Sequence, residues 1–188
     1  MTAVKVLAPP PLDEREIRRY AGCRDKTDAL LDERLVTCIQ ELLPLLHYTV
    51  CMRQLSPAEI TSFTARSEAL TRHLASCERV VLLAATLGVA PDRLVVKYGQ
   101  IVPSKAVLIQ AVATERIEAL CQAACRELER ETGLSATKRF SPGYGDLPLD
   151  AQRDVFALLS CEKHLGVTLN DSLLMSPSKS VTAFVGLR

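Results

Sequence analysis

Apolar residues recur at spacings of three and four along two stretches of the chain, which is the period of a helix packed on one side. The first stretch covers about residues 27–43 and stops at Pro44. The second covers residues 105 to about 132 and ends at Gly133, which predicts an unusually long helix. A shorter helix is predicted over residues 13–22, where Asp13 can cap the first turn.

Other stretches have the patterns of strands. Residues 79–87 are almost uniformly apolar, which is typical of a strand buried on both faces, and residues 47–55 are rich in β-branched and aromatic side chains. Strict alternation predicts a last strand over 181–187. Further helices are predicted over 67–77, from about 91 with a break at Pro103, and around 158–165. Helices and strands do not alternate regularly, so the pattern predicts an α+β fold.

Composition narrows the class of protein. A chain of 188 residues with 48% apolar and 24% charged residues can fold as one globular domain and is not disordered overall. The 23 Lys and Arg residues balance 22 acidic ones, so we expect neither nucleic acid nor an anionic membrane as a partner. The longest apolar run, residues 80–90, has about half the length of a membrane-spanning helix. We therefore expect a cytoplasmic protein.

Seven cysteines are scattered along the chain without any Cys-x-x-Cys pair, which indicates reduced and largely buried thiols. Cys121 and Cys125 are four residues apart on the long predicted helix, a spacing at which two side chains can share a metal ion. The three histidines, His47, His73 and His164, fall in unrelated segments. We therefore predict no metal site.

The most distinctive segment runs from Arg139 to Asp146, with the sequence RFSPGYGD. Pro142 fixes one backbone angle, and a glycine on each side of Tyr144 permits conformations closed to other residues. Such a loop can present backbone groups and an aromatic ring to a ligand, while Arg139 can hold a carboxylate or a phosphate. The alternative is a tight connection between two helices, with Arg139 capping carbonyl groups.

The motif Arg-x-x-Pro-Gly-Tyr, followed by a helix that contains the sequence EKHLG at 162–166, resembles the reactivation (activation) domain of cobalamin-dependent methionine synthase. The similarity continues through residues 167–175 and the loop at 177–181, and weakens over 105–128 and 84–88. The resemblance implies helices around a twisted, largely antiparallel sheet. It also implies one domain over residues 1–188, with a helical N-terminal part over about 1–45 and a ligand-binding half over about 105–188.

The resemblance further implies that the protein binds S-adenosylmethionine. In the family, the motif arginine holds the methionyl carboxylate, the loop backbone contacts the cofactor, and the tyrosine lies between cofactor and corrin. The loop positions that match the cofactor-binding motif are Arg139, Ser141, Pro142, Gly143 and Tyr144. Glu118 matches a family glutamate and is the candidate acceptor for the ligand's ammonium group, although a solvated helix residue is an equal alternative.

Two further features complete the comparison with the family. Ser178 and Lys179, in the loop at 176–180, can contact the cofactor or the cobalamin carrier, and the alternative is an exposed hairpin. Gly145 and Asp146 stand where the family usually has proline after the tyrosine, and the chain is shorter than the domain in full-length methionine synthase. The sequence thus resembles a compact, stand-alone version of the domain.

The function that the resemblance implies is reactivation: presenting S-adenosylmethionine for the reductive methylation of cob(II)alamin on a methionine synthase or related corrinoid methyltransferase. Partners would be a cobalamin-binding methionine synthase without its own activation domain and an electron donor of flavodoxin or ferredoxin type. Cobalt supplies the nucleophile, so we expect an accessory subunit in which Tyr144 is the residue nearest to catalysis. The alternatives are a non-catalytic module that senses S-adenosylmethionine or docks on a corrinoid protein, and a structural scaffold.

Overall fold

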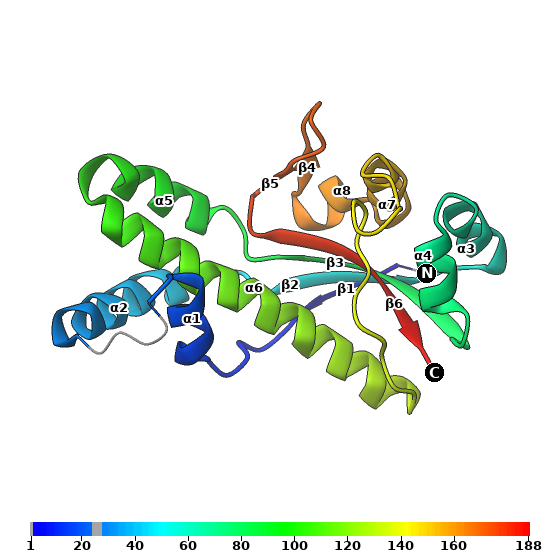
Figure 1. Ribbon diagram of the computed structural model, residues 1–188, viewed down its shortest axis with the longest axis horizontal. Coiled ribbons are helices and arrows are strands. Elements are labelled where there is room, and N and C mark those ends of the chain that lie inside the picture. Colours follow the sequence, from blue (N-terminus) through cyan, green and yellow to red (C-terminus); the bar gives the residue numbers. More distant parts are fainter. Residues whose placement is uncertain (1, 24–27) are drawn as a thin grey trace.

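The fold is built on a four-stranded antiparallel sheet in the order β1-β2-β3-β6, seen in a computed structural model that describes residues 2–23 and 28–188 (Figure 1). β3 is central because its side chains are almost all apolar, and it pairs with β6 from Arg79 opposite Leu187 to Thr86 opposite Ser180. The expected α+β class with an antiparallel sheet is confirmed. The strands are β1 (Thr2–Val6), β2 (Thr49–Gln54), β3 (Arg79–Thr86) and β6 (Ser180–Leu187).

One face of the sheet is covered by the long helix α6 (Pro103–Thr132). Its apolar stripe, which includes Ile117, Leu120 and Leu128, is buried against strand residues in one core cluster. Each large apolar side chain buried in this way stabilises the fold by about 1.5–3 kcal/mol. Further helices pack against the N-terminal half of α6 and form a second core cluster with it. α6 therefore contributes side chains to two cores. These helices are α1 (Glu14–Tyr20), α2 (Ala29–Leu42), the 3-10 turn η1 (Leu43–Leu45) and α5 (Ala90–Ile101).

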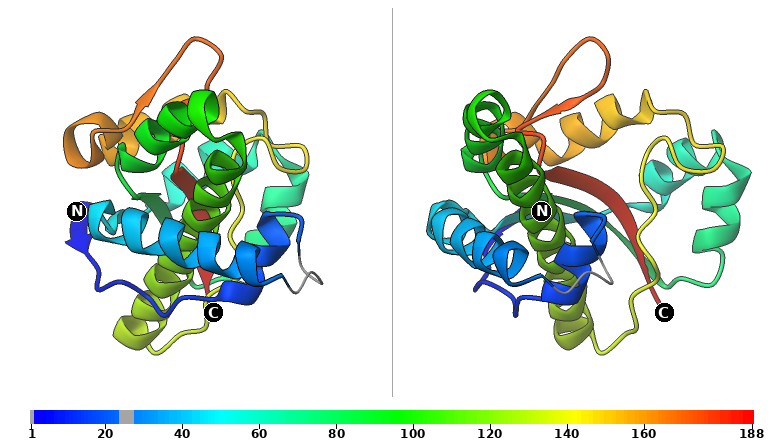
Figure 2. Two further views of the ribbon diagram at one scale, coloured as in Figure 1. Left: turned by 90° about the vertical axis from the view of Figure 1, so that its left-hand side faces the viewer. Right: turned by 60° about the vertical axis from the view of Figure 1, so that its left-hand side comes forward.

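Four shorter helices cover the opposite face, so that the sheet lies between two helical layers (Figure 2). Phe63, Leu70 and Val155 from these helices pack against Phe184 of β6 in a third core cluster. A small hairpin of β4 (Thr168–Leu169) and β5 (Met175–Ser176) precedes β6. The four helices are α3 (Pro57–Thr64), α4 (Glu68–Leu74), α7 (Ala151–Leu159) and α8 (Cys161–Leu165).

Most predicted elements are present. The helix expected from residue 27 begins at Ala29, after the capping residue Asp28, and residue 27 itself lies outside the described residues. α3 and β1 were not predicted, although the capping box of Ser56 and Glu59 is a sequence signal for the start of α3. Within the described residues, every helix is too short or too polar to cross a membrane.

After α6 the chain returns along the outer edge of β6 as an irregular fifth strand. The amides of Thr137 and Phe140 donate to the carbonyls of Gly186 (2.8 Å) and Phe184 (3.0 Å). Gly186 permits this approach, because a Cβ there would lie 2.3 Å from Cys77 Sγ and 3.1 Å from Thr137 Cγ2. The sheet edge thereby fixes the path of the chain up to the RFSPGYGD loop.

Candidate functional site

A hollow of about 760 Å³ lies between the segment that precedes α1 and the middle of α6. We call it the arginine groove; its lining includes Pro10, Pro11, Asp13, Glu115, Glu118 and Arg139. Asp13 also caps α1, as predicted, because its carboxylate accepts the amide of Glu16 at 3.1 Å. Three segments that are far apart in sequence therefore meet at one site.

Arg139 is the notable residue of this groove. One terminal nitrogen, Nη2, is paired with Oε2 of Glu118, so the structure brings these two predicted ligand residues together. The other, Nη1, is buried and has no hydrogen-bond partner among the described residues. Leaving a buried donor unpaired costs about 1–3 kcal/mol, which a carboxylate oxygen of a ligand can offset.

The opposite wall of the groove is fixed by a buried ion pair of adjacent residues on α6. Arg116 is paired with Glu115 and also donates to the carbonyls of Pro10 (2.6 Å) and Pro11 (2.7 Å). Burial alone lowers the pKa of Arg116, but the hydrogen bond and the charge of Glu115 outweigh it and the net shift is upward. Sequence reasoning missed this pair, and its only sequence signal is two charges within an apolar stretch of α6.

A second hollow, of about 480 Å³, lies along the start of β6, beyond the point where Phe140 pairs with Phe184. We call it the edge groove; its lining includes Ser141, Pro142, Gln152, Met175, Ser178 and Thr182. The Ser141 hydroxyl donates to the carbonyl of Thr182 (2.7 Å), and the Thr182 hydroxyl donates to Gln152 Oε1 (3.0 Å). An apolar lining with a few fixed polar groups is typical of small-molecule sites.

The loop itself is closed by its own hydrogen bonds. The amide of Gly143 donates to the Leu147 carbonyl (2.9 Å) and that of Tyr144 to the Ser141 carbonyl (3.1 Å). The Tyr144 side chain is 67% exposed, although its ring meets that of Phe140 edge-on, with centroids 5.4 Å apart. Tyr144 is therefore held on one side and open to solvent on the other.

The loop at 176–180 is tied to the rest of the fold. Asp92, in the first turn of α5, accepts from both the amide (2.9 Å) and the hydroxyl of Ser178. The Lys179 ammonium donates to Thr114 Oγ1 on α6 (2.9 Å), and Lys179 is only 8% exposed. The side chain of Lys179 therefore points toward α6, and neither groove includes it in its lining.

The residues predicted to bind the cofactor thus occupy four places around the loop. They are Glu118 and Arg139 in the arginine groove, Ser141, Pro142 and Ser178 in the edge groove, Gly143 and Tyr144 on the loop but in neither lining, and Lys179 inside.

The two cysteines considered as metal ligands lie in the core. Cys121 and Cys125 are buried against the sheet, and burial raises the pKa of Cys125 to about 11. Across residues 2–23 and 28–188, no three His, Cys, Asp or Glu side chains are grouped as a metal site requires.

Comparison with known proteins identifies the family. The family model of the activation domain of vitamin B12 dependent methionine synthase matches residues 84–187, which is more than half of the chain. The chain belongs to this family. A crystal structure of the MetH reactivation domain bound to AdoHcy superposes with a TM-score of 0.62 and 14% identity, covering 86% of this chain and 67% of that chain. No curated protein sequence matches the chain.

The family match confirms the resemblance drawn from the RFSPGYGD loop. In this activation domain the matched region holds Glu118, Arg139 and the whole edge groove, whereas the wall formed by Pro10, Pro11 and Asp13 lies outside it. The structure therefore adds a wall to the arginine groove that the family match does not cover.

Lys179 provides a test of the electrostatics beside the grooves. Burial lowers the pKa of the Lys179 ammonium in the folded state. At pH values below this lowered pKa, the buried charge reduces the free energy of unfolding by its full amount. The reduction disappears as the pH rises toward the unfolded pKa of about 10.5, because the folded protein then holds Lys179 neutral. We expect Lys179→Met to raise the free energy of unfolding at pH 7 by about 1–3 kcal/mol, and to lose this advantage near pH 10. Urea unfolding at several pH values measures it. A variant less stable than the parent at pH 7 would contradict this assignment.

Proposed function

We propose that this activation domain binds S-adenosylmethionine across the arginine groove and the edge groove and presents its methyl group to cobalamin held by a partner. The observation that carries the proposal is the buried, unpaired Nη1 of Arg139 beside the carboxylate of Glu118, within the region that matches the family. The structural neighbour bound to AdoHcy supports the same ligand class.

The methionyl end of the ligand fits the arginine groove by charge. Its carboxylate would accept from Nη1 of Arg139 once a neighbouring side chain moves aside to expose that atom, while Nη2 keeps its pairing with Glu118. Its ammonium group would be held by a carboxylate of the groove, and Glu118 is accessible for this with 44% of its side chain exposed. A zwitterion needs both charges, and Arg139 and Glu118 offer them side by side.

The nucleoside end of the ligand fits the loop and the edge groove. Pro142, Leu149 and Met175 offer apolar surface to a flat base. The hydroxyl of Ser141 and the amide of Gln152 add polar groups that their own hydrogen bonds already orient. Tyr144, exposed on the same loop but outside the lining of both grooves, would cover the ligand on the side from which the carrier approaches.

S-adenosylmethionine would supply a methyl group activated by its sulfonium. The cobalamin of the partner, once reduced from cob(II) to cob(I) by one electron from a flavodoxin or ferredoxin, would supply the nucleophile for that methyl group, and S-adenosylhomocysteine would remain. The protein's own residues bind and orient, which is enough when cobalt supplies the nucleophile. The carrier would be a methionine synthase without its own activation domain. Seven unpaired cysteines suit the reducing cytoplasm.

The Arg139 assignment predicts a loss of ligand affinity. Arg139→Ala should weaken S-adenosylmethionine binding by about 1.5–3 kcal/mol, the range for hydrogen bonds to charged groups. Arg139→Lys should recover only part, because a point charge cannot pair with Glu118 and a carboxylate in the same forked geometry. Titration calorimetry measures both.

The matched control is Arg126→Ala. Arg126 also lines the arginine groove but is exposed, so its loss removes the same charge without removing the buried donor, and affinity should stay near that of the parent. Equal affinity of the parent and Arg139→Ala, with both folded, would refute the assignment.

The Tyr144 assignment predicts a loss of rate. Tyr144→Ala should slow methylcobalamin formation far more than it weakens S-adenosylmethionine binding, because small displacements of reacting atoms cost much rate. Tyr144→Phe keeps the ring and serves as the control. The assay mixes the protein with a cob(II)alamin-loaded methionine synthase fragment, a reductant and S-adenosylmethionine, and follows absorbance. A parent protein that binds the ligand yet never accelerates methylation would indicate a sensing or docking module instead.

A further inference from the structure

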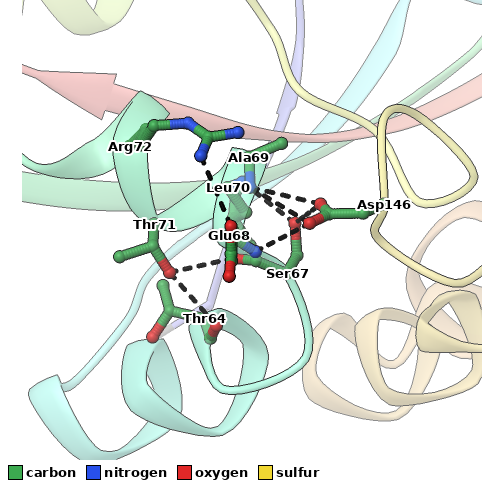
Figure 3. Close-up of polar contacts among 8 residues, drawn as sticks. All are labelled: Thr64, Ser67, Glu68, Ala69, Leu70, Thr71, Arg72 and Asp146. Carbon is green, nitrogen blue, oxygen red and sulfur yellow. Dashed lines mark hydrogen bonds and ion pairs between the residues drawn. The ribbon is translucent and has the colours of Figure 1, made fainter.

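The far end of the RFSPGYGD loop is bound to the N-terminus of α4. The Asp146 carboxylate accepts the hydroxyl of Ser67 and the amides of Glu68 (2.9 Å) and Ala69 (3.2 Å), as Figure 3 shows. These amides belong to the first turn of the helix, where backbone N–H groups have no acceptor within the helix itself. The hydrogen bonds, that from Ser67 foremost, lower the pKa of Asp146, so the carboxylate is charged at neutral pH.

The near end of the loop is bound to the other end of the same helix. Nε2 of His73, in the last turn of α4, lies 2.7 Å from the carbonyl oxygen of Lys138, the residue before Arg139. A carbonyl only accepts, so Nε2 carries the proton. The His73 ring also lies against Phe140, with centroids 5.3 Å apart.

Between these two ends the loop lies directly on α4. Gly145 has a φ of +60°, and a Cβ there would lie 3.1 Å from the Cβ of Ala69 and 3.5 Å from Cζ of Phe140. A larger residue at 145 would push the loop off the helix. α4 is itself fixed, because Leu70 is fully buried in the core and the Ser67 hydroxyl accepts the amide of Leu70 (2.9 Å).

We propose that α4 is a fixed support that holds the loop from Arg139 to Asp146 at both ends in its ligand-binding conformation. Asp146 and His73 are then positioning residues, which act through Arg139 and Tyr144 without touching the ligand. The predicted effect on ligand binding rests on the proposed function, whereas the support of the loop by α4 does not. A loop held in one conformation binds without first losing conformational freedom.

The test compares Asp146→Ala with Ser56→Ala, which removes the capping oxygen of the neighbouring helix α3 and leaves the loop untouched. Calorimetric titration with S-adenosylmethionine should show about tenfold weaker binding for Asp146→Ala, as expected if the loop keeps its binding conformation about a tenth of the time. Ser56→Ala should bind like the parent. Asp146→Asn, which retains one accepting oxygen, should recover part of the loss. His73→Phe, which keeps a ring against Phe140, should also weaken binding.

Hydrogen exchange separates local release of the loop from overall destabilisation, which would also raise the exchange of amides in the core strands. The amides of Gly143 and Leu147, both bonded within the loop, should exchange faster in Asp146→Ala while amides of β6 keep their protection. Unchanged exchange at Gly143, unchanged affinity, or equal effects of Ser56→Ala would overturn the proposal. If the parent does not bind S-adenosylmethionine, the proposed function fails, and the exchange measurement alone decides whether α4 supports the loop.

Discussion

Arg139 has two terminal nitrogens in different situations: one is paired with Glu118, and the other is buried without a partner among residues 2–23 and 28–188. A guanidinium keeps its charge at any physiological pH, so the unpaired donor cannot be relieved by losing a proton. A hydrogen-bond acceptor, such as a carboxylate oxygen, can pair this donor. The path of the chain along β6 and the contacts to α4 place this side chain and its loop, while Arg116 holds the opposite wall of the groove through the carbonyls of Pro10 and Pro11.

The sequence predicts the framework well where the pattern is long and local. The stripe on α6, the uniformly apolar β3 and the alternation in β6 each specify an element without reference to the rest of the chain. α3 was missed because its apolar positions are few and its start is marked by a capping box rather than by periodicity. β1 was missed because a five-residue edge strand has only one neighbour to define it.

The candidate site is predicted less completely, and for a physical reason. The loop motif identified Arg139 and Tyr144, since proline and glycine spacing is visible in a sequence. The groove wall at Pro10 and Pro11 depends on Arg116, more than a hundred residues away, and adjacent charges on a helix more often face solvent. Gly145 and Asp146 stand where the resemblance leads one to expect proline after the tyrosine, and only the structure shows that Asp146 binds α4.

The central claim is that Arg139 binds the carboxylate of S-adenosylmethionine. The most direct measurement removes the arginine alone, the ligand carboxylate alone, and both together. Titration calorimetry would compare S-adenosylmethionine with its decarboxylated analogue on the parent and on Arg139→Ala. If the two groups interact, the parent prefers the carboxylate-bearing ligand by about tenfold or more, and Arg139→Ala binds both ligands with similar affinity. The same preference in both proteins would contradict the account.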